Sequence, residues 1–514
     1  MRLSSREKGV AMALMGLDVG TSGVKCTIAD DRGAVIAEAY RPYETLMPQA
    51  GYFELNANEI WEKTKATMKE ALAATSEKVY AVAASSFGEA FTTVDKDQNV
   101  LTNFMTMTDI RGTEEMERLR DRISDEQITE KTSLKPALTY SLSKLMWLHE
   151  EAPEIYRRVD KMLPGGAFIT YRLTGGVASA DYALSARTLC FNVHTKDWDN
   201  DIIEAAGLDR SIFPDLVPMG TVVGEMDPQL AQELGLSYHD IKVVIGTHDQ
   251  IAAGIGGAVD EPGMACNGTG TVDCILPIYR AGDVDIARNA SHNYPLVPYM
   301  NDLSTTYAYI FDGGALIAWY KDVLGSSERH AAEVTGQSVY DILDHEAPSE
   351  PTRLLFLPHL SGAALPYMDP FSKGAVLGLD RNTDKGTLFR GMCEGQAYEL
   401  KVNLDLMEEG GIHVNALRAT GGGSVSDLRM QIKADVWNRP IEVMKIKNAG
   451  TLGLIIMGGV ACGIFKDYHE AMHAMNQPLK TFHPDPKNVA FYAEQYEKYR
   501  KVYQMQKEIL AEEA

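Results

Sequence analysis

Gly20-Thr21-Ser22-Gly23-Val24-Lys25-Cys26-Thr27-Ile28 lies near the N-terminus, and Gly268-Thr269-Gly270-Thr271-Val272-Asp273-Cys274-Ile275-Leu276 repeats it near the middle of this 514-residue chain. Gly, Thr, Val and Cys stand at the same relative positions in the two copies. In each copy an apolar run enters a Gly/Thr turn and a β-rich run leaves it, which predicts a tight β-hairpin. Such a turn presents successive backbone N–H groups and a hydroxyl, which together suit a phosphate. We therefore expect two related lobes around a nucleotide.

The bulk composition is that of a globular protein with more than one domain. Hydrophobic residues make up 45% of the chain and charged residues 23%, and the length allows two or more cores. The net charge of −22 argues against a nucleic-acid backbone or an anionic membrane surface as partner. A small anionic ligand stays compatible with this charge, because a local nest of N–H groups can bind it.

Cysteine usage and hydropathy predict a cytoplasmic location. The six cysteines form no CxxC pair and no Cys/His cluster, so zinc is not expected, and such usage fits a reducing compartment. No apolar run reaches the roughly 18–20 residues that span a bilayer. Residues 1–8 carry charge but no signal-like apolar core, and we interpret them as a frayed leader.

Strands alternate with helices along the chain, which indicates an α/β class. Residues 79–86 and 241–245 are predicted to be buried strands, and a helix is expected from an N-cap at Asn56 or Asn58 through Ala74. A long helix is expected from about Lys385 to Glu409. The C-terminal helix carries a stripe at Tyr492, Tyr496, Tyr499 and Tyr503, which we interpret as a packing face.

A run of small residues at 252–258 lies at the midpoint, just before the second motif. We interpret this run as the domain boundary and hinge. It predicts an N-terminal lobe over residues 12–253 and a C-terminal lobe over residues 254–514.

Asp18 and Lys25 flank the first turn. A carboxylate two residues before the turn could orient Mg²⁺ through water, because Mg²⁺ takes few protein ligands together with phosphate oxygens. The alternative is a turn-capping Asp, and the second copy of the motif favours the metal role. Lys25 lies on the outgoing strand, where it either reaches a phosphate or is solvated.

Asp249 is the predicted catalytic residue. It follows a buried apolar strand and sits in a turn of small residues. Ligands collect beyond the carboxyl ends of strands in open α/β sheets, and a carboxylate there can accept the proton of an attacking hydroxyl. His248 is either a second base or a structural histidine.

Three further polar segments are candidates for ligand contacts. Glu89 and the segment Thr108-Asp109-Ile110-Arg111 follow strand-like segments of the first lobe, where they could bind polyol hydroxyls or form a surface salt bridge. Gly421-Gly422-Gly423-Ser424 allows the backbone to approach a flat ligand closely.

Taken together these elements resemble the FGGY carbohydrate kinases of the actin/hexokinase-like ATPase superfamily. The similar segments, in the family's order, are the first phosphate loop (17–25), the catalytic-aspartate segment (246–250), the second phosphate loop (268–270), the C-terminal pattern (373–379, ending in Glu394-Gly395) and the adenosine-binding segment (419–424, with Gln431, Ala434 and Asp435). The resemblance covers nearly the whole chain. It implies an α/β fold of two actin-like (ribonuclease H-like) lobes with an internal duplication and a nucleotide cleft between them.

The resemblance also implies roles for individual residues. ATP and Mg²⁺ are the implied cofactors, Asp249 takes the proton of a primary hydroxyl, and Asp18 organises the metal. The implied cofactor-binding residues are Gly20, Thr21, Ser22, Lys25, Gly268, Thr269, Gly422 and Gly423. The implied substrate-binding residues are Glu89, Asp109, Arg111, Asp249 and Gln250. A homodimer is a family-level expectation.

The departures from the family pattern concern the acceptor. Glu89 stands where xylulokinases usually carry the His of Gln-Met-His-Gly. Glycerol kinases have a Glu there, but preceded by Arg, where this chain has Gly88. Met107 replaces the Trp of the Trp-x-Asp-x-Arg pattern, while Asp109 and Arg111 remain. The kinase activity therefore transfers with the resemblance, and the name of the substrate does not.

The sequence predicts an ATP-dependent kinase that phosphorylates a primary hydroxyl of a small neutral sugar, a ketose such as xylulose or a related pentulose. Glu89, Asp109 and Asp249 disfavour an anionic acceptor, because three carboxylates would repel it. A glycerol- or erythritol-type polyol kinase is the alternative. Two readings from other classes are an actin- or chaperone-like ATPase without a sugar acceptor and a nucleotide-binding regulator that has lost catalysis.

Overall fold

Two contact units make up the part of the chain, residues 12–510, that this computed structural model describes. Unit 1 comprises the residues up to Asp260 together with 295–305 and 448–477, and unit 2 comprises 261–294, 306–447 and the residues from Pro478 onward. This division differs from the single boundary expected between residues 253 and 254, because two later segments return to unit 1. The expected leader at residues 1–8 lies outside the described residues.

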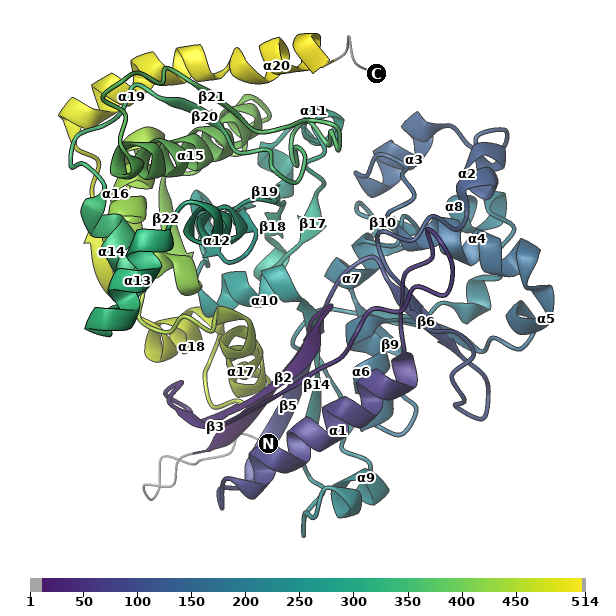
Figure 1. Cartoon of the computed structure of the whole chain (residues 1–514). Coiled ribbons are helices and arrows are strands. Elements are labelled where there is room, and N and C mark those ends of the chain that lie inside the picture. The colour runs from purple at the N-terminus through teal and green to yellow at the C-terminus, as the bar shows by residue number, and fades with distance from the viewer. Residues whose placement is uncertain (1–11, 511–514) are drawn as a thin grey trace. The chain divides into compact units, whose positions relative to one another are not determined.

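A six-stranded sheet forms the core of unit 1, with the strand order β13-β14-β5-β1-β2-β3 (Figure 1). The strands β1, β5 and β14 are parallel, β2 and β3 continue antiparallel beside β1, and β13 is antiparallel to β14. The bounds of the strands are Val222–Glu225 (β13), Lys242–His248 (β14), Val79–Ser86 (β5), Ala13–Val19 (β1), Gly23–Ala29 (β2) and Val35–Pro42 (β3).

The sheet of unit 2 repeats this arrangement of strand directions. A hairpin of β15 and β16 is extended by antiparallel β19, and beyond β15 follow parallel β22 and β23 and then antiparallel β24. Their bounds are Met264–Thr269 (β15), Asp273–Tyr279 (β16), Ala308–Ile310 (β19), Ala416–Thr420 (β22), Ile441–Met444 (β23) and Pro478–Phe482 (β24). Both predicted hairpins are confirmed, and the repeated sheet confirms the internal duplication.

Helices cover both faces of the first sheet. On one face, α1 (Ala57–Ala73) and α6 (Gly165–Leu173) share an apolar core with β1, β5 and β14. The helix α1 begins after Asn56, whose side chain accepts a hydrogen bond from the N–H of Glu59 at 3.0 Å. This is the first of the two N-caps that the sequence allowed.

Residues 252–256 of the predicted hinge instead belong to a helix. Asp249–Gly256 form α10, which packs on α17 (Ala449–Ala461) within unit 1. A Cβ added at Gly256 would lie 1.9 Å from the carbonyl oxygen of Ala449, and one added at Gly453 would lie 1.9 Å from that of Ala252. The small residues at 252–256 therefore allow two helix backbones to touch and do not form a loop.

The core of unit 2 contains three helices, α15 (Lys385–Glu409), α16 (Asp427–Trp437) and α19 (Pro486–Tyr499). The helix α15 has the bounds that the sequence predicted. The tyrosine stripe packs internally, and its hydroxyls donate to buried or half-buried carboxylates: Tyr492 to Glu394, Tyr496 to Asp405, Tyr499 to Glu399 and, from the next helix, Tyr503 to Asp369. This arrangement confirms that the stripe is a packing face.

Shorter elements complete the two units. Those of unit 1 are β4 (Glu54–Leu55), β6 (Phe91–Val94), β7 (Phe104–Met105), α2 (Thr113–Leu119), α3 (Asp125–Thr132), α4 (Ser141–Glu151), α5 (Pro153–Tyr156), β8 (Lys161–Pro164), β9 (Ser179–Asp181), α7 (Tyr182–Ala186), β10 (Phe191–Asn192), β11 (Asp197–Trp198), α8 (Asn200–Ala205), β12 (Asp215–Val217), α9 (Pro228–Glu233), β17 (Val297–Pro298), β18 (Ser304–Thr305) and α18 (Tyr468–Met475). Those of unit 2 are α11 (Ile286–Ser291), α12 (Gly314–Val323), α13 (Ser326–Thr335), α14 (Val339–Glu346), β20 (Leu355–Leu357), β21 (Ala375–Leu377) and α20 (Val502–Leu510).

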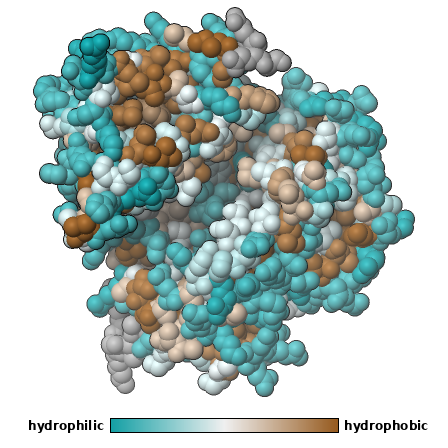
Figure 2. All heavy atoms as spheres, viewed as in Figure 1, coloured by the Kyte–Doolittle hydropathy of each residue, from teal (hydrophilic) through white to brown (hydrophobic). Residues whose placement is uncertain are grey.

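Hydrophilic side chains predominate on the face of the molecule shown in Figure 2, with apolar patches scattered between them. This distribution fits the net charge of −22. Among residues 12–510, no helix combines the length and the apolar character that crossing a membrane would require.

A buried ion pair lies beneath the second hairpin in unit 2. The Lys433 ammonium donates to Asp273 Oδ2 at 2.5 Å and to Asn267 Oδ1 at 2.9 Å, and the Asn267 amide donates to Asp273 Oδ1 at 2.7 Å. Burial lowers the pKa of Lys433, and the Asp273 carboxylate opposes this shift. Removal of one partner would leave the other charge buried and uncompensated.

We expect Lys433→Met to lower the free energy of unfolding by about 3–5 kcal/mol, the range found when one partner of a buried pair is removed. Lys498→Met is the matched control, because Lys498 pairs with Glu494 at 2.8 Å in an exposed i,i+4 pair. Such a pair contributes about 0.3–0.5 kcal/mol. Urea unfolding followed by circular dichroism measures both, and equal midpoints for the two variants would contradict the prediction.

Candidate active site

Asp18 lies where three parallel strands of unit 1 end together. In the sheet register Asp18 is opposite Ser85, and the next strand places His248 beside Ser86. The Ser85 hydroxyl donates to Asp18 Oδ1 at 2.8 Å. Burial and, to a smaller extent, the charge of Asp249 raise the pKa of Asp18 to about 6, although the Ser85 hydrogen bond and Lys25 act in the opposite direction. Two predicted functional carboxylates far apart in sequence therefore interact electrostatically.

Asp249 is the first residue of α10, directly after β14. Its Oδ1 accepts the N–H of Gln250 at 2.6 Å and lies 3.0 Å from His248 Nδ1. A carboxylate at this position interacts favourably with the positive end of the helix dipole. Burial lowers the pKa of His248, but the charge and hydrogen bond of Asp249 outweigh it and the pKa is raised. The structure therefore presents Asp249 as a carboxylate oriented by its own helix and by a neighbouring imidazole.

Asp181 holds the end of β14 in place by hydrogen bonds. It is fully buried, and its Oδ2 accepts the Thr247 hydroxyl at 2.9 Å and the N–H of Ala183 at 2.9 Å. Burial raises the pKa of Asp181 to about 6, although these hydrogen bonds oppose the shift. Thr247 directly precedes His248 and Asp249, so this contact fixes the backbone from which the predicted base projects.

Glu89 lies against the same histidine, held by an arginine that the sequence analysis did not identify. Arg187 donates to Glu89 Oε1 from Nε at 2.7 Å and also from Nη2. A Cβ added at Gly88 would lie 2.7 Å from the His248 ring, so the backbone before Glu89 contacts the histidine directly. The signal that could have found Arg187 is its isolated charge in the otherwise charge-poor segment 182–193.

Asp109 and Arg111 form a buried pair of their own. Arg111 donates to Asp109 from Nε at 2.9 Å and from Nη2 at 2.6 Å, and Asp109 also accepts the N–H of Phe53 at 2.8 Å. Burial raises the pKa of Asp109, but the hydrogen bonds of Arg111 outweigh it and the pKa is lowered. The guanidinium lies 4.4 Å from the Tyr52 ring centre and 5.0 Å from that of Trp147. These hydrogen bonds and ring contacts give Asp109 and Arg111 a structural role. Contact of this pair with an acceptor stays a prediction.

A cavity of about 350 Å³ adjoins this pair, lined by polar and apolar side chains that include Arg111, Glu54, Asn103 and Trp147. Neither Glu89 nor Asp249 lines it. Lys144 links the two regions electrostatically: burial lowers its pKa to about 8, and the charges of Asp109 and Glu89 oppose the shift.

The second turn and the glycine loop come together in unit 2. Gly268 of β15 is opposite Thr420 of the parallel strand β22, and the Thr269 hydroxyl donates to the Thr420 carbonyl at 2.6 Å. Gly421 has φ +88°, and a Cβ added there would lie 3.0 Å from the Thr269 carbonyl oxygen. An added Cβ at Gly422 meets nothing within 4 Å. The predicted contacts Gly268, Thr269, Gly422 and Gly423 therefore gather at neighbouring strand ends.

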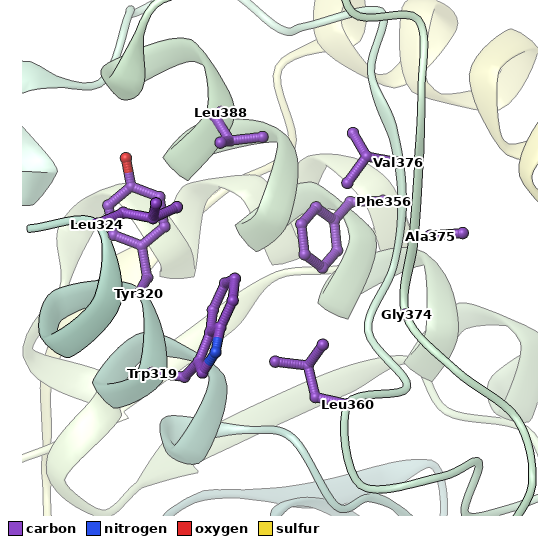
Figure 3. Close-up of a pocket in the computed structure, with 9 residues that line it drawn as sticks. All are labelled: Trp319, Tyr320, Leu324, Phe356, Leu360, Gly374, Ala375, Val376 and Leu388. Carbon is purple, nitrogen blue, oxygen red and sulfur yellow. The ribbon is translucent and has the colours of Figure 1, made fainter.

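An apolar cavity of about 240 Å³ lies elsewhere in unit 2 (Figure 3). Trp319 of α12 and Phe356 of β20 point toward a common space, and the lining residues include no charged side chain. Polar ligands need convergent hydrogen-bonding groups, so this cavity does not suit a sugar.

The residues around Asp18 fit a divalent cation. The charge of Asp249 adds to the cost of ionising Asp18, and a cation beside Asp18 removes that cost. Oxygen ligands are those that Mg²⁺ prefers. Thr21 and Ser22 of the adjacent turn are exposed, as phosphate contacts must be.

We expect Asp18→Asn to stabilise the protein by about 2–3 kcal/mol at pH 7.5 and by about half as much at pH 5. The raised pKa means that the folded state favours the protonated form, so the wild type loses stability as the pH rises from about 4, where this carboxyl ionises in the unfolded chain, to about 6, where it ionises in the folded protein. Asparagine carries no charge and can still accept the Ser85 hydrogen bond. Urea midpoints at the two pH values measure the effect.

Asp97→Asn serves as the control for Asp18→Asn, because Asp97 is exposed. Its substitution should not change the difference between the two pH values. A destabilised Asp18→Asn at pH 7.5 would mean that the Asp18 carboxylate is stabilising in the fold, against the direction derived from its burial.

Comparison with known proteins shows the family to which this chain belongs. Residues 13–256 match the model of the FGGY family of carbohydrate kinases, N-terminal domain, and residues 293–462 match that of the C-terminal domain. Xylulose kinase of Bacillus subtilis (strain 168) is 24% identical over 96% of this chain and 97% of its own length. Glycerol kinase 1 of Clostridium tetani is 29% identical over 93% and 95%.

Solved structures share the fold of the whole chain. Ligand-bound xylulose kinase from Lactobacillus acidophilus superposes with a TM-score of 0.86 at 24% identity, covering 97% of this chain and 98% of that one. Gluconate kinase from the same organism gives 0.85 at 24% identity, with 98% of each chain covered. The fold is thus the two-lobe actin-like fold that the family resemblance implied, with the two related lobes that the duplicated motif predicted.

Proposed function

The chain belongs to the FGGY family of carbohydrate kinases, and we propose that it transfers the γ-phosphoryl group of ATP, with Mg²⁺, to a primary hydroxyl of a small neutral ketose such as xylulose or a related pentulose. As a family member it is a phosphotransferase that acts on a sugar hydroxyl. The observation that supports the proposal most is Asp249, which lies at the head of α10 within electrostatic range of Asp18.

Asp249 is the proposed base. It accepts the proton of the attacking hydroxyl, while the Gln250 N–H and the His248 imidazole hold its Oδ1 in place. Most of the catalysis in phosphoryl transfer comes from positioning and charge stabilisation. A fixed carboxylate at a helix N-terminus supplies the first of these.

Asp18 is the proposed metal-organising residue, with Mg²⁺ supplying charge stabilisation for the phosphoryl group when bound. Gly20, Thr21, Ser22 and Lys25 are the proposed phosphate contacts of unit 1. In unit 2 the proposed contacts are Gly268 and Thr269 for phosphate and Gly422 and Gly423 for the nucleoside.

The charges around the acceptor residues support a neutral substrate, for a revised reason. Two of the three carboxylates thought to repel an anion have an arginine partner: Glu89 pairs with Arg187, and Asp109 shares Arg111 with Glu54. Neither arginine is therefore available to hold an anionic acceptor without breaking an ion pair. An aldonic acid would need such an arginine to compensate its carboxylate.

A glycerol- or erythritol-type polyol is the second candidate. Glu89 favours it, because glycerol kinases resemble this chain in having Glu at that place. A homodimer and a cytoplasmic location also stay predictions.

Coupled ADP release with Mg-ATP tests the proposal on glycerol, erythritol, D- and L-xylulose, D- and L-ribulose, gluconate and water alone. We expect one ketose to dominate. Asp249→Asn should lower kcat by about 10²–10⁴-fold, the usual contribution of a positioned base, and leave ATP binding unchanged. Asp97→Asn is the matched control.

Other outcomes of this panel have distinct meanings. A response to glycerol or erythritol alone would select the polyol alternative. Turnover that ignores every sugar would favour the ATPase reading, and ATP binding without turnover on any acceptor would favour the regulator. Unchanged kcat in Asp249→Asn would refute the assignment of the base.

We expect Glu89→Gln to raise KM for the acceptor by about 10–100-fold and to leave KM for ATP unchanged. A hydrogen bond to a charged group contributes about 1.5–3 kcal/mol, and Glu89 is held for such a bond by Arg187. Glu77→Gln, an exposed glutamate of the same unit, is the control. Steady-state kinetics with the preferred acceptor measures the change, and equal effects on both KM values would place Glu89 in a general structural role.

A further inference from the structure

We propose that Asp260, His469 and His473 form a binding site for a divalent transition metal of the Zn²⁺ class, separate from the catalytic centre. One ligand atom from each residue lies within 4.8 Å of the others. All three residues belong to unit 1. The proposal goes beyond the kinase activity and does not depend on it.

The two histidines face the same way because of their spacing. They lie four residues apart on α18, and side chains at i and i+4 share one face of a helix. Their ring centres are 4.3 Å apart. Asp467 caps the start of this helix by accepting the N–H of Glu470 at 2.9 Å, which anchors the turn that carries His469.

Asp260 supplies a nearly buried carboxylate opposite this pair. Its side chain is 5% exposed, whereas those of His469 and His473 are 63% and 39% exposed. It follows α10, so the three residues come from two segments that are distant in the sequence. One side of the cluster is thus fixed in the protein, and the other is open to an ion from solvent.

The distances match a metal centre after a small adjustment. Asp260 Oδ2 lies 3.5 Å from His473 Nε2 and 2.5 Å from His469 Nδ1. Tetrahedral zinc with bonds of about 2.0–2.2 Å separates neighbouring ligand atoms by about 3.3 Å. One distance already fits, and the other opens by rotation of the exposed His469 ring.

The donor set selects the class of metal. Two imidazoles and one carboxylate suit Zn²⁺, Ni²⁺, Co²⁺ or Cu²⁺, whereas Mg²⁺ and Ca²⁺ prefer oxygen ligands throughout. Three protein ligands leave at least one position for water. Cysteines do not compete for the metal, because all six are buried.

Metal binding here would tie α18 to the end of the catalytic helix. The Asn476 amide, just after α18, already donates to the carbonyl of Gly256, the last residue of α10, at 2.8 Å. A metal at Asp260 would add a second link between these segments. The folded state would then be stabilised in proportion to metal occupancy.

Zinc titration of the full-length protein without nucleotide tests the proposal, because ATP would itself chelate the metal. We expect one equivalent of Zn²⁺ to bind with a Kd below about 10 μM and to raise the melting temperature, with no displacement by millimolar Mg²⁺. His469→Gln and His473→Gln should each weaken binding at least about tenfold, since each removes one of three protein ligands. His469 is exposed and His473 is partly exposed, so the variants should fold, which circular dichroism checks.

His330→Gln is the matched control. His330 is exposed on α13 and its Nδ1 lies 3.9 Å from Glu333 Oε2, but among residues 12–510 it belongs to no three-ligand group. Its substitution should leave zinc affinity unchanged. The proposal is overturned if the wild type binds no zinc below about 100 μM, or if the His469 and His473 variants bind it as tightly as His330→Gln does.

Discussion

The contact between α10 and α17 is the constraint on which the arrangement of unit 1 depends. Gly256 and Gly453 let the two backbones approach so closely that a methyl group at either position would overlap a carbonyl oxygen. The helix α17 also packs on β1 and β5, and a Cβ at Gly16 would lie 2.7 Å from the Thr451 carbonyl. Asp249 begins α10 and Asp18 ends β1, so the same packing sets the position of both carboxylates.

The carboxylates that we propose for catalysis also carry an electrostatic cost. Burial and mutual repulsion raise the pKa of Asp18 to about 6, so the folded protein is less stable at neutral pH than a neutral side chain would make it. Asp249 is offset by the helix terminus, whereas Glu89 and Asp109 each have an arginine. A residue that destabilises the fold and lacks an arginine partner of this kind is expected where a cation is to be bound.

Local patterns in the sequence predicted much of this structure. Glycine and threonine turns between apolar runs predicted both hairpins. The N-cap of α1 was one of the two asparagines that the sequence allowed. Asp249 was predicted because it follows the end of a buried strand. The run 252–258 was misinterpreted because small residues are equally typical of loops and of close helix packing, and α17, which decides between them, lies about 200 residues later. The pairing of Arg187 with Glu89 and that of Asp260 with His469 were not found, because each depends on a contact between distant segments.

The duplication explains how one fold came to divide its tasks. In each sheet the hairpin is followed by two parallel strands, and the helices after the second of these strands are α10 in one copy and α17 in the other. Asp249 begins α10, whereas Asn448 precedes α17. Asp18, two residues before the first turn, corresponds to Cys266 before the second, and Lys25 corresponds to Asp273, which Lys433 neutralises in the core. The first copy thus keeps its charged groups where they can act on a ligand, and the second copy has turned the same positions into core contacts. The glycine loop packed on Thr269 is the segment of the second copy that we propose contacts the nucleoside.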